Sequence, residues 1–156
     1  MSHTKELLKI LEDTSKFLLE ISAVEEEKFQ AAMKNHILVL EDCIKKEQAL
    51  VLRSKGLDLK RAAVQKAMGA EGMTLKQIIE AADAAEKPAL QTAFRELEKN
   101  LNTYQEIYHR AKTAIEVNLH RVNMHLEKMT GASPSYSGQG VRKQPVSGGN
   151  LTSRRI

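Results

Sequence analysis

The sequence predicts an all-α protein, an elongated antiparallel up-and-down helical bundle or coiled coil of three to four helices with a disordered C-terminal tail. Three observations lead to this fold class. The 156 residues include no Trp, only three Phe, three Tyr and three Pro, and are rich in the helix formers Ala, Leu, Glu and Lys. No Gly or Pro interrupts residues 1–55, and one heptad pattern continues from residue 90 to residue 122. A chain of this length suits one domain, predicted over residues 1–130 and followed by the tail at 131–156.

The region from about residue 4 to residue 68 is predicted to be either one long helix or a kinked pair. Apolar residues recur at helical spacing at both ends of the region, but the pattern fails in SAVEEEK, residues 22–28. Ser22 and Glu25 have the S-x-x-E spacing of a capping box, which marks the start of a helix. We therefore favour a bend at Ser22 between helices over 4–21 and 23–68, and a continuous helix with a polar middle turn is the alternative.

The stretch after residue 68 is predicted to reverse the chain. Gly69 and Gly72 can end a helix in left-handed geometry at little cost. Thr74 stands three residues before a Gln, which is again capping-box spacing and predicts a short helix over about 75–85. Pro88 can occupy the first turn of the next helix, which is predicted over about 88–130.

This last helix carries the clearest pattern in the sequence, a heptad seam held for more than four heptads. Its members are Leu90, Phe94, Leu97, Leu101, Tyr104, Tyr108, Ala111, Ile115, Asn118 and Val122. Folding back at the corner would place residue 64 opposite residue 90 and residue 50 opposite residue 104. Glu47 would then lie near Tyr104 or Tyr108, as a carboxylate–hydroxyl pair that sets the helix register.

The C-terminal residues 131–156 differ in composition from the rest of the chain. They hold five of the eight Gly and two of the three Pro, and their apolar residues stand alone. Burial of one such side chain contributes about 1.5–3 kcal/mol, whereas ordering the backbone costs roughly 1–2 kcal/mol for every residue. The entropy term dominates, so we expect this flexible, Gly/Ser/Pro-rich segment to be disordered until a partner supplies a surface.

The net charge of +4 does not indicate a nucleic-acid partner. Four of the 24 Lys and Arg residues lie after residue 130, where no acid occurs, so the rest of the chain balances 20 basic with 20 acidic residues. A basic face on the folded body is therefore not expected. No apolar run is long enough for a signal peptide or a membrane span, and the single cysteine, Cys43, fits a reducing compartment. These features predict a cytoplasmic protein.

The sequence contains no recognisable catalytic or cofactor-binding motif. Glu106 and His109 have E-x-x-H spacing, but a di-iron bundle needs two such motifs and two further Glu. His120 and His125 are five residues apart, point in different directions on a helix and lack the ligands that would complete a zinc site. No phosphate-binding glycine motif is present. We predict a non-enzyme without metal or cofactor.

The end of the last helix instead offers a surface for another protein. The apolar stripe widens there, with Leu119, Val122, Met124, Leu126 and Met129. Methionine adapts to varied partners, and such a stripe can hold an amphipathic helix. The alternative is that these residues pack on the folded-back segment 7–21. Both interpretations hold if a partner helix competes with that packing.

Two segments resemble the FlgN family, cytoplasmic chaperones of flagellar type III export. They are LEDCIKKEQALVLRSKGLDLKRAAVQKAMGAEGMTLKQII and the returning helix LEKNLNTYQEIYHRAKTAIEVNLHRVNMHLEKM. The resemblance covers about residues 5–130 and rests on patterns of helical residues. The tail segment SYSGQG is similar to the family's style only loosely.

The resemblance implies a chaperone that binds hook-associated (hook–filament junction) subunits, prevents their premature assembly and delivers them to the export gate without hydrolysing nucleotide. It implies that the client site is the end of the returning helix, which on this chain comprises Ile115, Leu119, Val122, Leu126 and Met129. It also makes Tyr136 a candidate contact with the export apparatus. The alternative is a structural coiled-coil adaptor that self-associates through the same seam, and a homodimer is compatible with either function.

Overall fold

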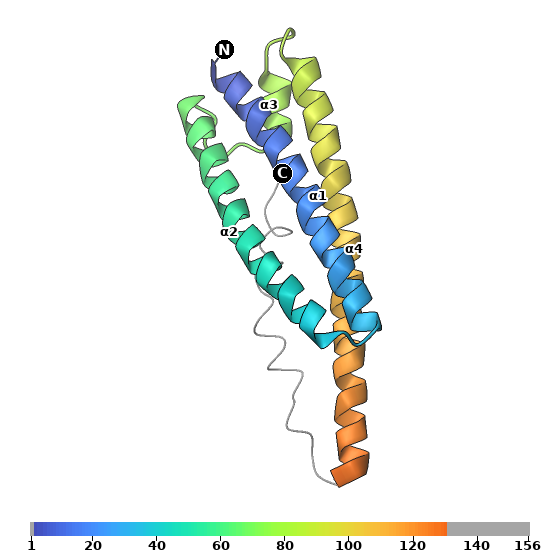
Figure 1. Cartoon of the computed structure of the whole chain (residues 1–156). Helices are drawn as coiled ribbons and strands as arrows, with labels where there is room; N and C mark the ends of the chain where they lie inside the picture. The colour runs from blue at the N-terminus through green and yellow to red at the C-terminus, as the bar shows by residue number, and fades with distance from the viewer. Residues whose placement is uncertain (1, 131–156) are drawn as a thin grey trace.

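The computed structural model describes residues 2–130, which form four helices joined by short connections. These are α1 (Ser2–Met33), α2 (Ile37–Ala67), α3 (Leu75–Ala81) and α4 (Lys87–Thr130). Figure 1 shows three long helices aligned along one axis, with the short α3 at one end. The prediction of an all-α helical bundle is confirmed. The disorder predicted for 131–156 concerns residues outside the described part of the chain.

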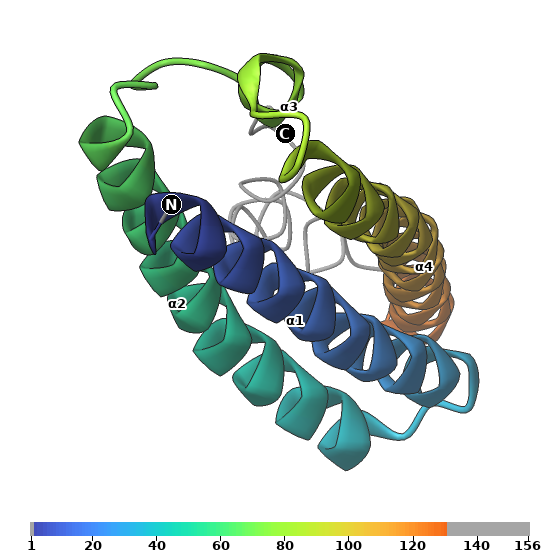
Figure 2. The same cartoon turned by 90° about the horizontal axis from the view of Figure 1, so that it is seen from above.

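Helix α1 lies between α2 and α4, and it makes most of the contacts between helices (Figure 2). It runs antiparallel to α2, because Glu20 pairs with Arg53 and Lys28 pairs with Glu47. It runs parallel to α4, because Ser15 is bonded to Asn100 while Ala32, further along α1, is bonded to Asn118, further along α4. The chain therefore runs up, down and up again, with α1 as the shared central helix.

The break in the first helical region lies at residues 34–36, not at Ser22. α1 is continuous through Ser22, and the chain turns at Asn35, which has a left-handed φ of 57°. Asparagine adopts this conformation more readily than most residues. The backbone N–H of His36 then donates to the carbonyl of Ala31 and closes the turn. Both sequence predictions, a bend at Ser22 and one helix over 4–68, were wrong.

The physical reason for this error is the burial of the polar segment that resembled a capping box. Ser22 and Glu25 lie in the buried face of α1, so their S-x-x-E spacing serves side-chain packing and does not start a helix. Lys28 is buried in the same face. The failure of the apolar pattern over residues 22–28 thus marked a polar part of the core rather than a kink.

The corner between α2 and α4 was predicted correctly in its main features. Gly69 and Gly72 both have positive φ, 71° and 79°, which a residue with a Cβ adopts only with strain. Thr74 and Gln77 form the capping box of α3 through reciprocal backbone and side-chain hydrogen bonds. α3 is shorter than predicted and ends at Ala81, and Pro88 occupies the first turn of α4.

The apolar core is concentrated at the end of the bundle where all four helices meet. It combines the first half of α1 with α3 and the first half of α4, and Val64 joins it from the end of α2. Its largest members that are almost wholly excluded from solvent are Leu7, Leu11, Phe17, Ile21, Leu75, Leu90 and Tyr104. Val64 and Leu90 both belong to this core.

Further along the bundle, α1 takes the place that the sequence had assigned to α2 beside α4. Glu47 accepts a hydrogen bond from Lys28 of α1. The hydroxyl of Tyr104 is buried and has no hydrogen-bond partner in the described structure, so Glu47 does not pair with Tyr104, the first of its two expected partners. Tyr108, the other one, lies beside Lys28. The reason is the turn at 34–36, which folds α1 back along α2 and puts it between α2 and α4.

Candidate functional site

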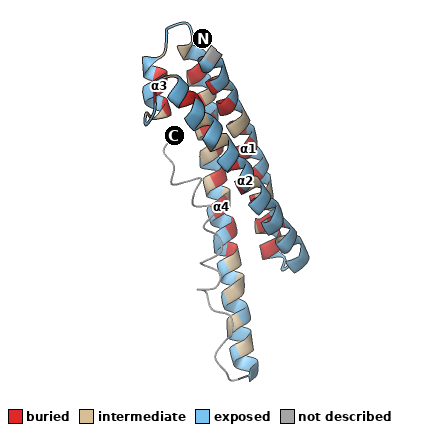
Figure 3. Ribbon diagram, turned by 90° about the vertical axis from the view of Figure 1, so that its left-hand side faces the viewer, coloured by how far each residue is buried: buried red, intermediate tan, exposed pale blue. Residues whose placement is uncertain are grey.

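The C-terminal end of α4 extends past the end of the α1–α2 hairpin. The side-chain amide of Asn118 donates to the carbonyl of Ala32, one residue before α1 ends at Met33. α4 continues to Thr130, so its last twelve or so residues project about 18 Å beyond this contact. Figure 3 shows that burial ends where the projection begins.

One face of α4 carries five of the residues that the sequence singled out, four of them on the projection and Ile115 just before it. At about 100° per residue, Ile115, Leu119, Val122, Leu126 and Met129 continue the face on which Tyr108 and other core residues of α4 are buried. Val122 and Met129 are 48% and 71% exposed, and the other three are half-buried. We call these five residues the terminal face. It is the core seam of α4 carried beyond the helices that cover it.

Met124, the sixth residue predicted for this cluster on α4, lies elsewhere. It is two residues from Leu126, and therefore about 160° away from it around the helix. It shares its side of α4 with Val117, seven residues earlier, and both are exposed. Tyr136, the seventh predicted site residue, lies outside the described residues.

The alternative prediction, that these residues pack on segment 7–21, was wrong. That segment lies at the other end of the bundle, where the carbonyl of Ser15 accepts a hydrogen bond from Asn100. The parallel course of α1 and α4 keeps it there. The terminal face is therefore not covered by the first helix.

A groove on the side of α4 that carries Val117, away from the terminal face, was not found from the sequence. It has a volume of about 520 Å³ and is formed by the end of α1 and by α4, with Phe29, Met33 and Val117 among its apolar lining residues. Arg110 lies over the ring of Phe29, 5.2 Å from its centroid, and bonds to Glu26 at 3.2 Å. The only signal in the sequence was the four-residue spacing of Phe29 and Met33, and nothing local tied that pair to α4.

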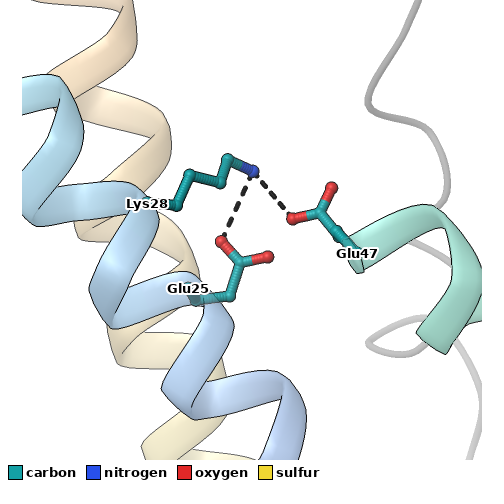
Figure 4. Close-up of polar contacts among 3 residues, drawn as sticks. All are labelled: Glu25, Lys28 and Glu47. Atoms are coloured by element: carbon teal, nitrogen blue, oxygen red, sulfur yellow. Dashed lines mark hydrogen bonds and ion pairs between the residues drawn. The ribbon is translucent and has the colours of Figure 1, made fainter. Parts of the chain in front are cut away.

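Three charged side chains are buried between α1 and α2 (Figure 4). The ammonium of Lys28 donates to Oε2 of Glu47 at 2.7 Å and lies 3.4 Å from Oε2 of Glu25. The side chain of Glu25 is fully excluded from solvent, and the other two are about 7% exposed. Lys28 also lies 5.9 Å from the centroid of the Tyr108 ring, so the cluster reaches α4.

Burial controls the protonation of this cluster. It raises the pKa of Glu25 to about 8, and the neighbouring Glu47 carboxylate adds to the shift while Lys28 opposes it. Burial also disfavours the ionised forms of the other two groups, but the interaction of each with Glu25 and their attraction for one another prevail. The pKa of Lys28 is consequently raised and that of Glu47 lowered. At neutral pH the cluster therefore holds Lys28 and Glu47 as ions and a proton on Glu25.

The cluster is better suited to joining helices than to chemistry. The pKa of Tyr104 is raised by burial and by the nearby carboxylates, so its hydroxyl stays protonated. Burial, together with Glu27, raises the pKa of Cys43, which keeps that thiol unreactive.

No group of three or more potential metal ligands occurs within residues 2–130. No helix in the same range is long and apolar enough to cross a membrane.

Comparison with known proteins gives one match. A family model described as FlgN protein matches residues 1–144. No curated protein matches the chain, and no solved structure matches it.

Proposed function

Because the chain belongs to the FlgN family of flagellar export chaperones, we propose that it binds hook-associated subunits in the cytoplasm and delivers them to the export gate. It acts as a non-enzymatic binding protein that covers a client helix until export. The client site is the terminal face of α4. A second copy of the chain is the competing occupant, as a permanent coiled-coil adaptor would require.

The observation that carries this proposal is that the apolar seam of α4 continues beyond the end of α1, the helix that covers it. α4 keeps the spacing of its core residues from Tyr108 to Met129, yet α1 ends beside Asn118. Full burial of an exposed apolar side chain contributes about 1.5–3 kcal/mol, and much of this remains to be gained at Val122 and Met129. A partner that buries several such side chains can offset the cost of association and still dissociate. An affinity between micromolar and nanomolar is expected for a client that has to be released.

The shape and chemistry of the terminal face suit an amphipathic helix of the client. A projecting helix offers a stripe with i, i+3 and i+4 spacing, into which the apolar face of a second helix packs. The flexible side chain of Met129 lets the stripe accommodate different partner side chains.

The experiment that tests the proposal mixes the purified chain with each hook-associated subunit of its own organism and measures the mass of the complex by light scattering after size exclusion. A one-to-one complex is expected. Leu126→Asp should abolish it, because this substitution puts a charge in the middle of the terminal face.

Met124→Asp is the matched control, since it adds the same charge on the opposite side of the same helical turn. It should leave the complex intact. An equal loss in both variants would contradict the assignment of the terminal face. A dimer that ignores every subunit would favour the adaptor.

A further inference from the structure

The side of α2 that points away from α1 carries a second set of uncovered apolar residues. Leu38, Leu52 and Leu59 are 81%, 68% and 73% exposed. They belong to one row with seven-residue spacing, which Lys45 and Lys66 complete. The buried residues of α2, among them Cys43, Glu47 and Ser54, lie on the opposite side of the helix. We call the side that contains this row the outer face of α2.

A row of small residues runs beside the leucines. Ala49, Gly56 and Ala63 are exposed and also follow each other at intervals of seven. Gly56 lies in the middle of α2, and a Cβ added to it would meet nothing within 4 Å. Packing within the chain therefore does not require a glycine there, although one costs about 0.5–1 kcal/mol relative to alanine. Small side chains next to Leu52 and Leu59 let another helix approach the backbone closely.

The charges on α2 divide between its two edges. Lys46 and Arg53, on the edge toward α1, are paired with acids that include Glu27 and Glu20 of α1. Four other exposed cations form no ion pair within the described residues: Lys45, Lys55, Lys60 and Lys66.

The acids of α2 compensate these lysines only at its start. Glu41 is exposed on the outer face four residues before Lys45, and Asp42 is paired with Lys46. Glu47 is buried and Asp58 is half-buried, so neither belongs to the outer face. Between residues 45 and 66 the outer face therefore carries Leu52 and Leu59 in its centre, Lys45 and Lys66 at the two ends of their row, and Lys55 and Lys60 at its sides.

We propose that the outer face of α2 binds an amphipathic helix of another protein, one with an apolar seam and acidic flanks. The two rows extend over about 42 Å, from residue 38 to residue 66, which is long enough for several heptads of a partner helix. Acidic side chains at its borders would pair with the four unpaired lysines. A second copy of this chain fits less well, because an antiparallel pairing centred near Leu52 and Gly56 sets Lys55 against its own equivalent.

This surface and the terminal face of α4 lie on different helices with α1 between them. A client helix and the acidic helix can therefore be bound at the same time. The inference goes beyond the proposed function, since it assigns a separate surface to a separate partner.

The test uses two fluorescent helical peptides of about four heptads with the same Leu and Ala seam. One peptide has Glu at its flanking positions and the other has Lys. Fluorescence anisotropy with the full chain is expected to show binding of the Glu peptide at least tenfold tighter than binding of the Lys peptide. Because surface charges are screened by salt, the preference should decrease as ionic strength rises.

Two variants connect this binding to the outer face. Leu52→Asp/Leu59→Asp should weaken binding of the Glu peptide at least tenfold. The milder Leu52→Ala/Leu59→Ala should also weaken this binding, and the circular dichroism of the chain should stay unchanged. Leu126→Asp is the control and should bind the Glu peptide normally.

Three outcomes would overturn the proposal: equal affinity for the two peptides, unaltered binding by both double variants, or a dimer of the free chain that Leu52→Asp/Leu59→Asp converts to monomer. The last outcome assigns the face to a second copy. The hook-associated subunit should bind the Leu52/Leu59 variants normally, so failure here is distinguishable from failure of the chaperone proposal.

Discussion

Lys28 of α1 and Glu47 of α2 are joined by a 2.7 Å hydrogen bond in the interior of the bundle, nineteen residues apart in sequence. The turn at Asn35 brings them together, since it folds α2 back along α1. Glu25 lies beside them with neither carboxyl oxygen hydrogen-bonded in the described structure. An ionised carboxylate without donors is costly to bury, so this residue retains a proton that it can direct toward Glu47. The first two predictions follow from this cluster.

Glu25→Gln should make the chain more stable at pH 8, by roughly 1–3 kcal/mol. The pKa of Glu25 is about 8 in the folded chain and 4.5 at its ordinary value. Between these values the folded state holds a proton that the unfolded state has lost, so the contribution of Glu25 to stability falls as pH rises from about 4.5 to 8. Gln is neutral throughout and can donate in place of the protonated acid.

Urea unfolding of both proteins at intervals between pH 5 and pH 8.5 measures this effect. The difference in the free energy of unfolding should grow with pH and level off above pH 8. A constant difference would mean that Glu25 is ionised in the folded chain at neutral pH. Glu26→Gln, one residue along and outside the cluster, is the control and should show no such growth.

Lys28→Met should destabilise the chain by about 3–5 kcal/mol at neutral pH, because it removes the cation that lies between two buried carboxyl groups. Replacing the whole cluster, as Glu25→Leu/Lys28→Met/Glu47→Leu, should restore most of this stability, since no buried charge then lacks a partner. Denaturant unfolding at pH 7 measures both. If the triple variant were as unstable as Lys28→Met, the cluster would contribute more than an apolar core of the same size.

Gly56→Ala should stabilise the chain by about 0.5–1 kcal/mol. The residue lies in an exposed part of α2, and the added methyl group meets no atom within 4 Å. Gly72→Ala is the contrasting control, because Gly72 also has free space but a φ of 79° that alanine adopts only with strain. Thermal unfolding should show a higher Tm for the first variant and a lower Tm for the second.

Leu97→Asp should unfold the bundle, whereas Leu126→Asp should leave its Tm nearly unchanged. Both leucines belong to the seam of α4, and about four heptads separate the first from the second. Leu97 is 2% exposed in the apolar core, while Leu126 lies beyond the end of α1. Circular dichroism melting distinguishes the two. A Leu126→Asp variant that unfolds would show that the terminal face is part of the core.

The individual helices were largely predictable because local rules determine them. The heptad spacing from Leu90 onward defined α4, the two glycines after Met68 ended α2, and Thr74 with Gln77 started α3. In each case the stabilising contacts are made within a few residues of the chain. The same spacing identified the apolar residues from Ile115 to Met129 that form the terminal face.

Tertiary structure decided how the helices are arranged and which apolar residues they leave uncovered. Sequence spacing places Leu119 and Tyr108 on one side of α4, but only the end of α1 at Met33 leaves Leu119 beyond the hairpin. Ser22 and Glu25 have the spacing of a helix start, but in the folded chain both are buried inside α1 by packing against other helices. Phe29 meets Val117 in one groove through contacts that span more than eighty residues. Local propensity determines where a helix forms, whereas the burial of a side chain depends on elements that are distant in sequence.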